Sequence, residues 1–151
     1  MTRWPLPKPM RAALAAAAQA GALGEVPIGA VVVKQGVVIA AAHNAPRGDC
    51  DPTAHAEVVA IRAAARALGQ ERLTGCDLWV TLEPCAMCAG AIVHARLERV
   101  YYAASDPKGG AVEHGARVFD APGCLHRPEV YSGIGESEAA ELLRGFFRGR
   151  R

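Results

Sequence analysis

The segment DLWVTLEPCAMCAGAIVHA, residues 77–95, decides the fold class of this chain. Its first six residues are rich in β-branched and aromatic side chains and predict a buried strand. Pro84 then predicts the first turn of a helix that runs to about Ala95, because the fixed φ of proline suits that position. A strand that passes directly into a helix is the building unit of α/β domains.

The rest of the chain continues this alternation of strands and helices. Apolar runs predict strands over residues 28–33, 37–42, 99–105 and 129–131, with a hairpin turn at Gln35–Gly36. Helices are predicted from Pro9 to Gly21 or Gly24, from an Asp51 or Thr53 cap to Leu68, over 116–119, and from about Ser137. The pattern predicts one sheet with helices on both of its faces.

Length and composition indicate one folded domain over residues 1–151, with the proline-rich residues 1–8 loosely held. A net charge of +2 and 21% charged residues argue against disorder, but they do not by themselves indicate a nucleic-acid binder. Five cysteines, an odd number, argue against a disulfide framework and for a reducing, cytoplasmic location. The run RAALAAAAQAGALG predicts a helix, not a secretory signal, and no run is long enough to span a membrane.

Two thiols stand three positions apart, Cys85 and Cys88, at the start of the predicted helix. That spacing places both on one helix face, and the unpaired N–H groups of the first turn stabilise thiolates there. A lone C-x-x-C is equally compatible with a redox pair, a metal site or simple burial. A third ligand is needed to decide between them.

His55 and Glu57 lie at the start of the preceding predicted helix. Two helix starts that follow strands can meet at one edge of a sheet. One histidine and two thiolates leave tetrahedral zinc one open position, which is typical of catalytic zinc. Glu57 is not needed as a ligand and is free to move a proton.

His-Ala-Glu together with Pro-Cys-x-x-Cys is the signature of zinc-dependent nucleobase deaminases. Longer segments, from about Met10 to Arg151, resemble the bacterial tRNA-specific adenosine deaminases. They are EVPIGAV, DPTAHAEVVAIR, LWVTLEPCAMCAGAIVHARLERV and ELLRGFFRGRR. The resemblance implies a cytidine-deaminase-like fold, three α/β/α layers around a mixed sheet of about five strands.

The resemblance also implies the reaction and its residues: hydrolytic deamination of adenosine to inosine at the wobble position of a tRNA anticodon loop. One Zn²⁺ per subunit would be held by His55, Cys85 and Cys88, with Glu57 as the proton shuttle. Substrate-binding roles fall on Asn44, Val26, Pro27, Ala56, Leu82, Pro84 and Asp106. Asn44 would hold the base, and Asp106 would accept a hydrogen bond from a ribose 2′-OH.

The partners implied by the resemblance are the tRNA anticodon stem-loop and a second copy of the chain. RNA contacts are predicted at Lys108, His126, Arg127, Arg144, Arg148 and Arg150. The tail RGFFRGRR has two interpretations: its arginines form a basic patch for phosphates, or Phe146 and Phe147 close the core beside a solvated face.

Several alternatives stay open at this point. Ser105, Gly109 and Leu125 depart from the family pattern, so a deaminase of a free base or nucleoside such as guanine or cytosine is the second interpretation. A non-catalytic, zinc-stabilised RNA-binding module is the third. Asn44 also suits a simple turn. Cys50, Cys76 and Cys124 are interpreted as ordinary thiols, His43 and His94 as packing residues, and His114 as loop surface.

Overall fold

The computed structural model describes residues 5–150 of the chain and shows a five-stranded sheet in the order β2-β1-β3-β4-β5. The strands are β1 (Gly29–Lys34), β2 (Val37–His43), β3 (Cys76–Leu82), β4 (Arg99–Ala104) and β5 (Glu129–Tyr131). β1 runs antiparallel to both β2 and β3, whereas β3, β4 and β5 run parallel to one another. The predicted mixed sheet is confirmed.

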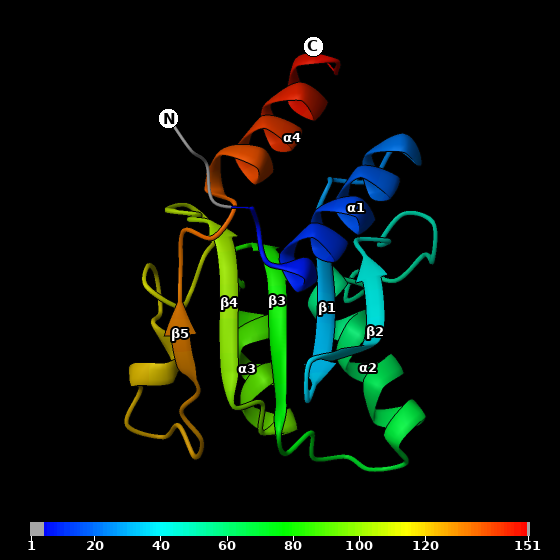
Figure 1. Cartoon of the computed structure of the whole chain (residues 1–151). Helices are drawn as coiled ribbons and strands as arrows, with labels where there is room; N and C mark the ends of the chain where they lie inside the picture. The colour runs from blue at the N-terminus through cyan, green and yellow to red at the C-terminus, as the bar shows by residue number, and fades with distance from the viewer. Residues whose placement is uncertain (1–4, 151) are drawn as a thin grey trace.

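Helices cover both faces of this sheet (Figure 1). They are α1 (Lys8–Ala22), α2 (Ala56–Leu68), α3 (Ala86–Ala95) and α4 (Glu136–Arg148), with a short 3₁₀ turn at Val118–Asp120. α2 and α3 share one apolar core with the sheet, and α1 and α4 share another on the opposite face. The three-layer prediction is therefore confirmed. No helix within residues 5–150 is both long and apolar enough to cross a membrane.

The alternation of side chains along β3 connects the two cores. Leu78 and Val80 point into the core under α2 and α3, and Trp79 packs on the α1 and α4 side. Successive side chains of a strand point to opposite faces, so a strand between two helical layers is apolar throughout. This is why residues 78–80 of β3 are all apolar.

Two predicted helix starts are corrected by the structure. α2 begins at Ala56 and not at Asp51 or Thr53, because the Asp51 carboxylate accepts hydrogen bonds from the Thr53 amide and hydroxyl, at 2.9 and 2.7 Å, and closes a turn of its own. α3 begins at Ala86, with Cys85 rather than Pro84 at its boundary. The predicted helix at 116–119 is a 3₁₀ turn over Val118–Asp120.

The N-terminal residues 1–8, predicted to be loosely held, are described only in part. Residues 1–4 lie outside the described residues, residues 5–7 have no regular structure, and Lys8 already belongs to α1.

Candidate metal and substrate site

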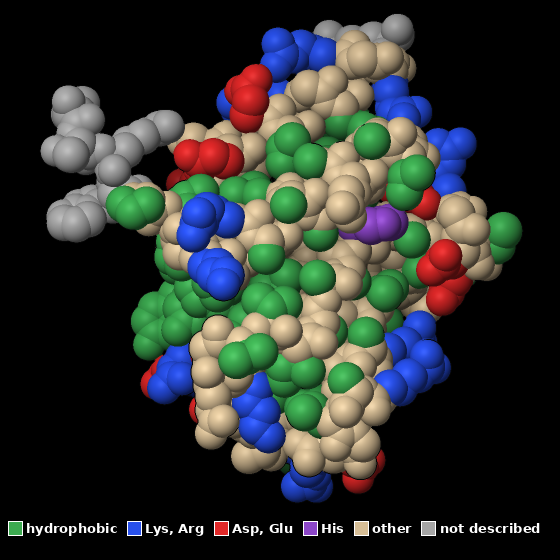
Figure 2. Space-filling view, turned by 45° about the vertical axis from the view of Figure 1, so that its right-hand side comes forward, with side chains coloured by type: hydrophobic (Ala, Val, Ile, Leu, Met, Phe, Trp, Pro, Cys, Tyr) green, Lys and Arg blue, Asp and Glu red, His purple; other side chains and the backbone are tan. Residues whose placement is uncertain are grey.

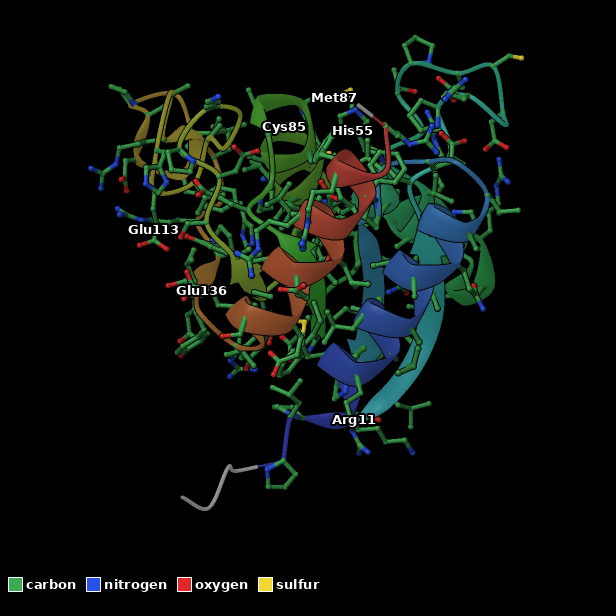
Figure 3. The ribbon with its side chains drawn as sticks, turned by 90° about the horizontal axis from the view of Figure 1, so that it is seen from above. Arg11, His55, Cys85, Met87, Glu113 and Glu136 are labelled. Atoms are coloured by element: carbon green, nitrogen blue, oxygen red, sulfur yellow. The ribbon has the colours of Figure 1, made fainter. Side chains whose placement is uncertain are left out.

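Three potential metal ligands meet where two helices begin. His55 immediately precedes α2, Cys85 immediately precedes α3, and Cys88 lies in the first turn of α3. The Nδ1 atom of His55 lies 3.6 Å from Sγ of Cys85 and 3.5 Å from Sγ of Cys88. Figure 3 shows His55 and Cys85 side by side at one end of the molecule.

The spacing of these donor atoms fits a tetrahedral metal ion. Zinc–sulfur and zinc–nitrogen distances of ~2.3 and ~2.05 Å place tetrahedral ligands about 3.5 Å apart. The two measured nitrogen–sulfur distances match that edge, and all three donor atoms lie within 4.8 Å of one another. His55, Cys85 and Cys88 could therefore hold a metal ion with one position left open.

The two thiols differ in acidity. A hydrogen bond from Cys88 is the main cause that lowers the pKa of Cys85 to about 5, and the same bond, together with burial, raises the pKa of Cys88. One thiolate is therefore favoured at neutral pH even before a metal is considered. A metal ion would favour the second thiolate in the same way.

Glu57 lies beside the ligands in the first turn of α2 and is only 4% exposed. Burial raises the pKa of its carboxyl, and a hydrogen bond with Cys88 opposes this shift without cancelling it. A raised pKa makes the protonated form of this carboxyl easier to reach than that of an exposed glutamate. Glu57 is thus a buried carboxyl in contact with one of the three potential metal ligands.

Asn44, which follows β2, is buried and anchors the start of α2. The side-chain Oδ1 atom of Asn44 accepts a hydrogen bond from the Ala56 backbone amide at 3.2 Å. The backbone amide of Asn44 donates to the Ile28 carbonyl at 2.9 Å. The Ala56 amide is consequently already used. The side-chain amide nitrogen of Asn44 is the end that can serve a substrate.

The residues predicted to form the pocket walls come from separate segments of the chain. Leu82, half-buried, is the last residue of β3, and Pro84, buried, immediately precedes Cys85. Val26 is half-buried before β1. Pro27 lines a groove of about 730 Å³ between α1 and α4, in which Leu14 and Phe146 also take part.

Asp106 lies in the loop after β4, and its carboxylate accepts hydrogen bonds from the Lys108 and Gly109 amides at 3.2 and 3.0 Å. Its own amide donates to Glu83 at 3.0 Å. Lys108 is exposed on the same loop. The loop that carries Asp106 and Lys108 is thus hydrogen-bonded to Glu83, in the segment before Cys85.

Glu83 is a residue that sequence reasoning missed. It is buried, and burial would raise the pKa of its carboxyl, yet hydrogen bonds from Asp106, His114, Glu113 and Val112 hold the pKa below its ordinary value. A charged residue within an apolar strand–helix junction was the available signal. His114 is also corrected, because its Nδ1 atom lies 2.7 Å from the Glu83 carboxylate and the ring is more than loop surface.

The C-terminal arginines are exposed but differ in their partners. Arg144 and Arg148 lie 2.8 and 3.3 Å from the Glu141 carboxylate. The Arg150 guanidinium lies over the Phe146 ring, 4.2 Å from its centre. Phe147 is 55% exposed, so the two phenylalanines do not simply close the core.

Arg150 also lines a hollow of about 700 Å³ with His43 and Arg47, alongside the loop that follows Asn44. The tail therefore reaches the side of the molecule on which the Asn44 loop lies. Arg47 was missed by sequence reasoning, although its place three residues after Asn44 was a signal.

His126 and Leu125 lie away from the ligands. His126 makes a 2.6 Å hydrogen bond with the Leu97 carbonyl, and Leu125 shares a hollow with His94 and Arg96. Those partners stand at the end of α3 opposite Cys85, and ten residues of helix separate the two ends by about 15 Å. Arg127 pairs with Asp120 in the same region.

Comparison with known proteins connects this site to a family. The MafB19-like deaminase model matches residues 7–151. A tRNA-specific adenosine deaminase of Agrobacterium fabrum is 61% identical over 142 residues, which cover 94% of this chain and 93% of the relative.

Comparison with solved structures points to the same family. A structure from a study of A-to-I editing by tRNA:A34 deaminases at the wobble position of transfer RNA has a TM-score of 0.88 and 60% identity, covering 89% of this chain and 98% of that one. A guanine deaminase from Bacillus subtilis is more distant, with a TM-score of 0.65, 38% identity and 82% of each chain covered. The chain therefore belongs to the family of tRNA-specific adenosine deaminases.

Proposed function

We propose that the chain is a zinc-dependent hydrolase that converts adenosine to inosine at the wobble position of a tRNA anticodon loop. The observation that carries the proposal is the group of His55, Cys85 and Cys88, spaced as a tetrahedral metal requires, next to the buried carboxyl of Glu57. Membership of a family whose members carry this name agrees with it.

His55, Cys85 and Cys88 would hold one zinc ion, since histidine and thiolate ligands favour zinc over harder cations. When bound, the ion would supply a Lewis acid at the open position and make a water acidic near neutral pH. The chain contributes the ligand geometry at the two helix starts.

Glu57 would move the protons of the reaction. It would accept a proton from the attacking water and pass it to the adenine ring nitrogen. It would then take the proton of the newly added hydroxyl, which becomes the carbonyl, and give it to the amine that leaves as ammonia. Water adds at the amine-bearing carbon and ammonia departs, so inosine is the product. Burial of Glu57 suits this role, because it keeps the carboxyl away from bulk water and beside the potential metal ligands.

Asn44 would orient the base through its side-chain nitrogen, with Val26, Pro27, Ala56, Leu82 and Pro84 around the base as the family resemblance implies. Asp106 would meet a ribose 2′-OH and Lys108 a phosphate. An anticodon-loop base is already unpaired, so extruding it costs little. Among the C-terminal arginines, Arg150 is best placed for phosphate contact because its hollow borders the Asn44 loop.

A deaminase of free guanine or cytosine is the alternative that the assay must separate. It was supported at the sequence level by Leu125, which is 83% exposed at the end of α3 opposite the ligands and does not shape the site. The structure therefore gives no particular support to this alternative.

The test is a deamination assay on an RNA hairpin with adenosine at the wobble position. Free adenine, guanine, cytosine and cytidine are offered in parallel, and the Glu57→Ala protein is the control. We expect inosine in the hairpin with the natural protein and a loss of about 10²–10⁴-fold in the variant. Turnover of a free base with an inert hairpin would reject the proposal.

We further propose that the chain acts as a homodimer in the cytoplasm, as the resemblance and the reducing composition predict. Light scattering would then give about twice the 15.8 kDa of one chain. A mass of one chain at working concentrations would reject the dimer.

A further inference from the structure

Glu83 is a carboxylate whose side chain is removed from solvent and whose partners are almost all backbone amides. Its side chain has 0% exposure. One oxygen, Oε2, accepts hydrogen bonds from three successive amides, those of Val112, Glu113 and His114, at 3.2, 3.0 and 3.2 Å. Successive N–H groups that converge on one anion form a backbone nest, a strong and geometrically specific contact.

The other oxygen, Oε1, holds the opposite end of the same loop. It accepts a hydrogen bond from the Asp106 amide at 3.0 Å and lies 2.7 Å from Nδ1 of His114. One side chain therefore binds residue 106 and residues 112–114 together. We call residues 106–114 the anchored loop.

The anchored loop is shaped to receive this carboxylate. A Cβ atom on Gly110 would lie within 2.6 Å of Oε2 of Glu83, so only glycine allows the approach. The next residue, Ala111, donates its amide to the Pro84 carbonyl at 2.9 Å. The loop is thus fitted to the two residues that precede Cys85.

We propose that Glu83 is a positioning residue that holds the anchored loop against the metal-ligand helix and so fixes Asp106 and Lys108 relative to the reacting end of the substrate. The part that concerns substrate rests on the proposed function. The part that concerns the loop rests only on the hydrogen bonds of Glu83.

Loss of this anchor has a distinct kinetic consequence. A loop that samples several conformations must be ordered when RNA binds, and that ordering opposes binding. The groups that do the chemistry, Glu57 and the metal ligands, keep their places. KM for the hairpin should therefore rise more than kcat falls.

Two variants weaken the contacts between Glu83 and the anchored loop to different extents. Glu83→Gln keeps one acceptor oxygen but turns an N–H₂ donor toward the Asp106 amide, which is itself a donor. His114→Ala removes only the side-chain contact and leaves the backbone contacts of Glu83 in place. The second variant keeps the proposal testable if the first folds poorly.

Two controls match these changes. Glu25 is also a buried carboxylate that accepts loop amides, from Arg47 and Gly48 at 3.3 and 2.7 Å. Glu25→Gln should loosen residues 47–48 and not the anchored loop. Glu98→Gln alters an exposed carboxylate immediately before β4 and should leave exchange and turnover unchanged.

The measurements are amide hydrogen exchange resolved by peptide, zinc content, and kcat and KM on the hairpin. For Glu83→Gln we expect roughly tenfold faster exchange confined to the anchored loop, one zinc per chain, and a KM raised roughly tenfold with a smaller fall in kcat. His114→Ala should show the same changes to a smaller extent.

Three results would overturn the proposal. They are unchanged exchange of the anchored loop in Glu83→Gln, faster exchange spread over the whole chain, and loss of zinc with a fall in kcat at constant KM. If the natural protein does not deaminate the hairpin, the proposed function fails. The exchange experiment would still decide whether Glu83 holds the loop.

Discussion

The two ends of the Asn44 amide serve different tasks. Oδ1 accepts the Ala56 N–H at 3.2 Å and so satisfies one of the unpaired amides at the start of α2. The nitrogen end is the donor that the proposed function assigns to the base. A substitution that keeps the acceptor and removes the donor separates the two tasks.

Asn44→Asp makes that substitution, and Asn44→Ala removes both ends. We expect Asn44→Asp to unfold in urea with a free energy close to that of the natural protein, and Asn44→Ala to lose about 1 kcal/mol. Both should lose roughly 10- to 100-fold in kcat/KM on the hairpin, because the base loses its hydrogen bond. Full turnover by Asn44→Asp would show that the amide nitrogen does not contact the base.

Sequence analysis identified the metal group but missed Glu83, and the difference lies in sequence distance. Cys85 and Cys88 are one helical turn apart, and His55 and Glu57 form one short motif, so their pattern is visible locally. The partners of Glu83 lie 23 to 31 residues away along the chain. Only the folded course of the loop brings them to the carboxylate.

At the level of elements, the metal group joins the starts of α2 and α3. His55 precedes one helix, and Cys85 and Cys88 begin the other, so a bound metal would link the starts of these two helices. Anything that binds the folded state alone stabilises it by linkage. Metal removal should therefore have a structural effect that is local to these two helix starts.

We expect chelation of the purified protein to lower the melting temperature by several degrees and to abolish turnover, with both restored by added zinc. Hydrogen exchange should accelerate at residues 55–59 and 85–89 before it accelerates elsewhere. The Cys88→Ser protein serves as the control, since it should already resemble the chelated protein. An unchanged melting temperature after verified zinc loss would contradict this linkage.

Strand and helix boundaries could be predicted from the sequence where a local signal determines them. The start of α2 could not be predicted in this way. Asp51 and Thr53 are good capping residue types, but they bind each other, and the α2 amide of Ala56 is bound instead by Asn44, twelve residues earlier. Sequence shows which residues can cap a helix. The tertiary fold decides which of them does.

The contact between β1 and α1 depends on Gly29. A Cβ atom there would overlap the Ala13 carbonyl and lie 2.6 Å from the Ala17 amide nitrogen. Gly29→Ala should therefore push α1 off the sheet and cost about 1–3 kcal/mol of unfolding free energy. Gly90→Ala is the matched control, because a Cβ in that helical position meets nothing within 4 Å and should stabilise by up to ~1 kcal/mol. Equal urea midpoints for the two variants would contradict the close approach.

On the scale of the whole molecule, a net charge of +2 does not show where the charges lie. Figure 2 shows Lys and Arg side chains at the top of the view together with acidic side chains, and further Lys and Arg side chains elsewhere on the same face. Beyond the C-terminal end of α4, Arg150 lies beside the Asn44 loop. Composition could not predict this arrangement, because it depends on where α4 ends relative to a loop about a hundred residues earlier.

The arginines of α4 should contribute unequally to RNA binding. Arg144 already pairs with Glu141 at 2.8 Å, whereas Arg150 stacks on Phe146 with its guanidinium beside the hollow that His43 and Arg47 line. Each phosphate contact to a single strand contributes about −0.7 to the slope of log K against log salt. We expect Arg150→Gln to weaken hairpin binding at low salt and to flatten that slope by about 0.7. Arg144→Gln, the matched control, should change both quantities much less.

Fluorescence anisotropy with a labelled hairpin over a series of KCl concentrations measures both the affinity and the slope. Equal slopes for Arg150→Gln and the natural protein would mean that the tail arginines form a solvated face, the other interpretation that the sequence left open.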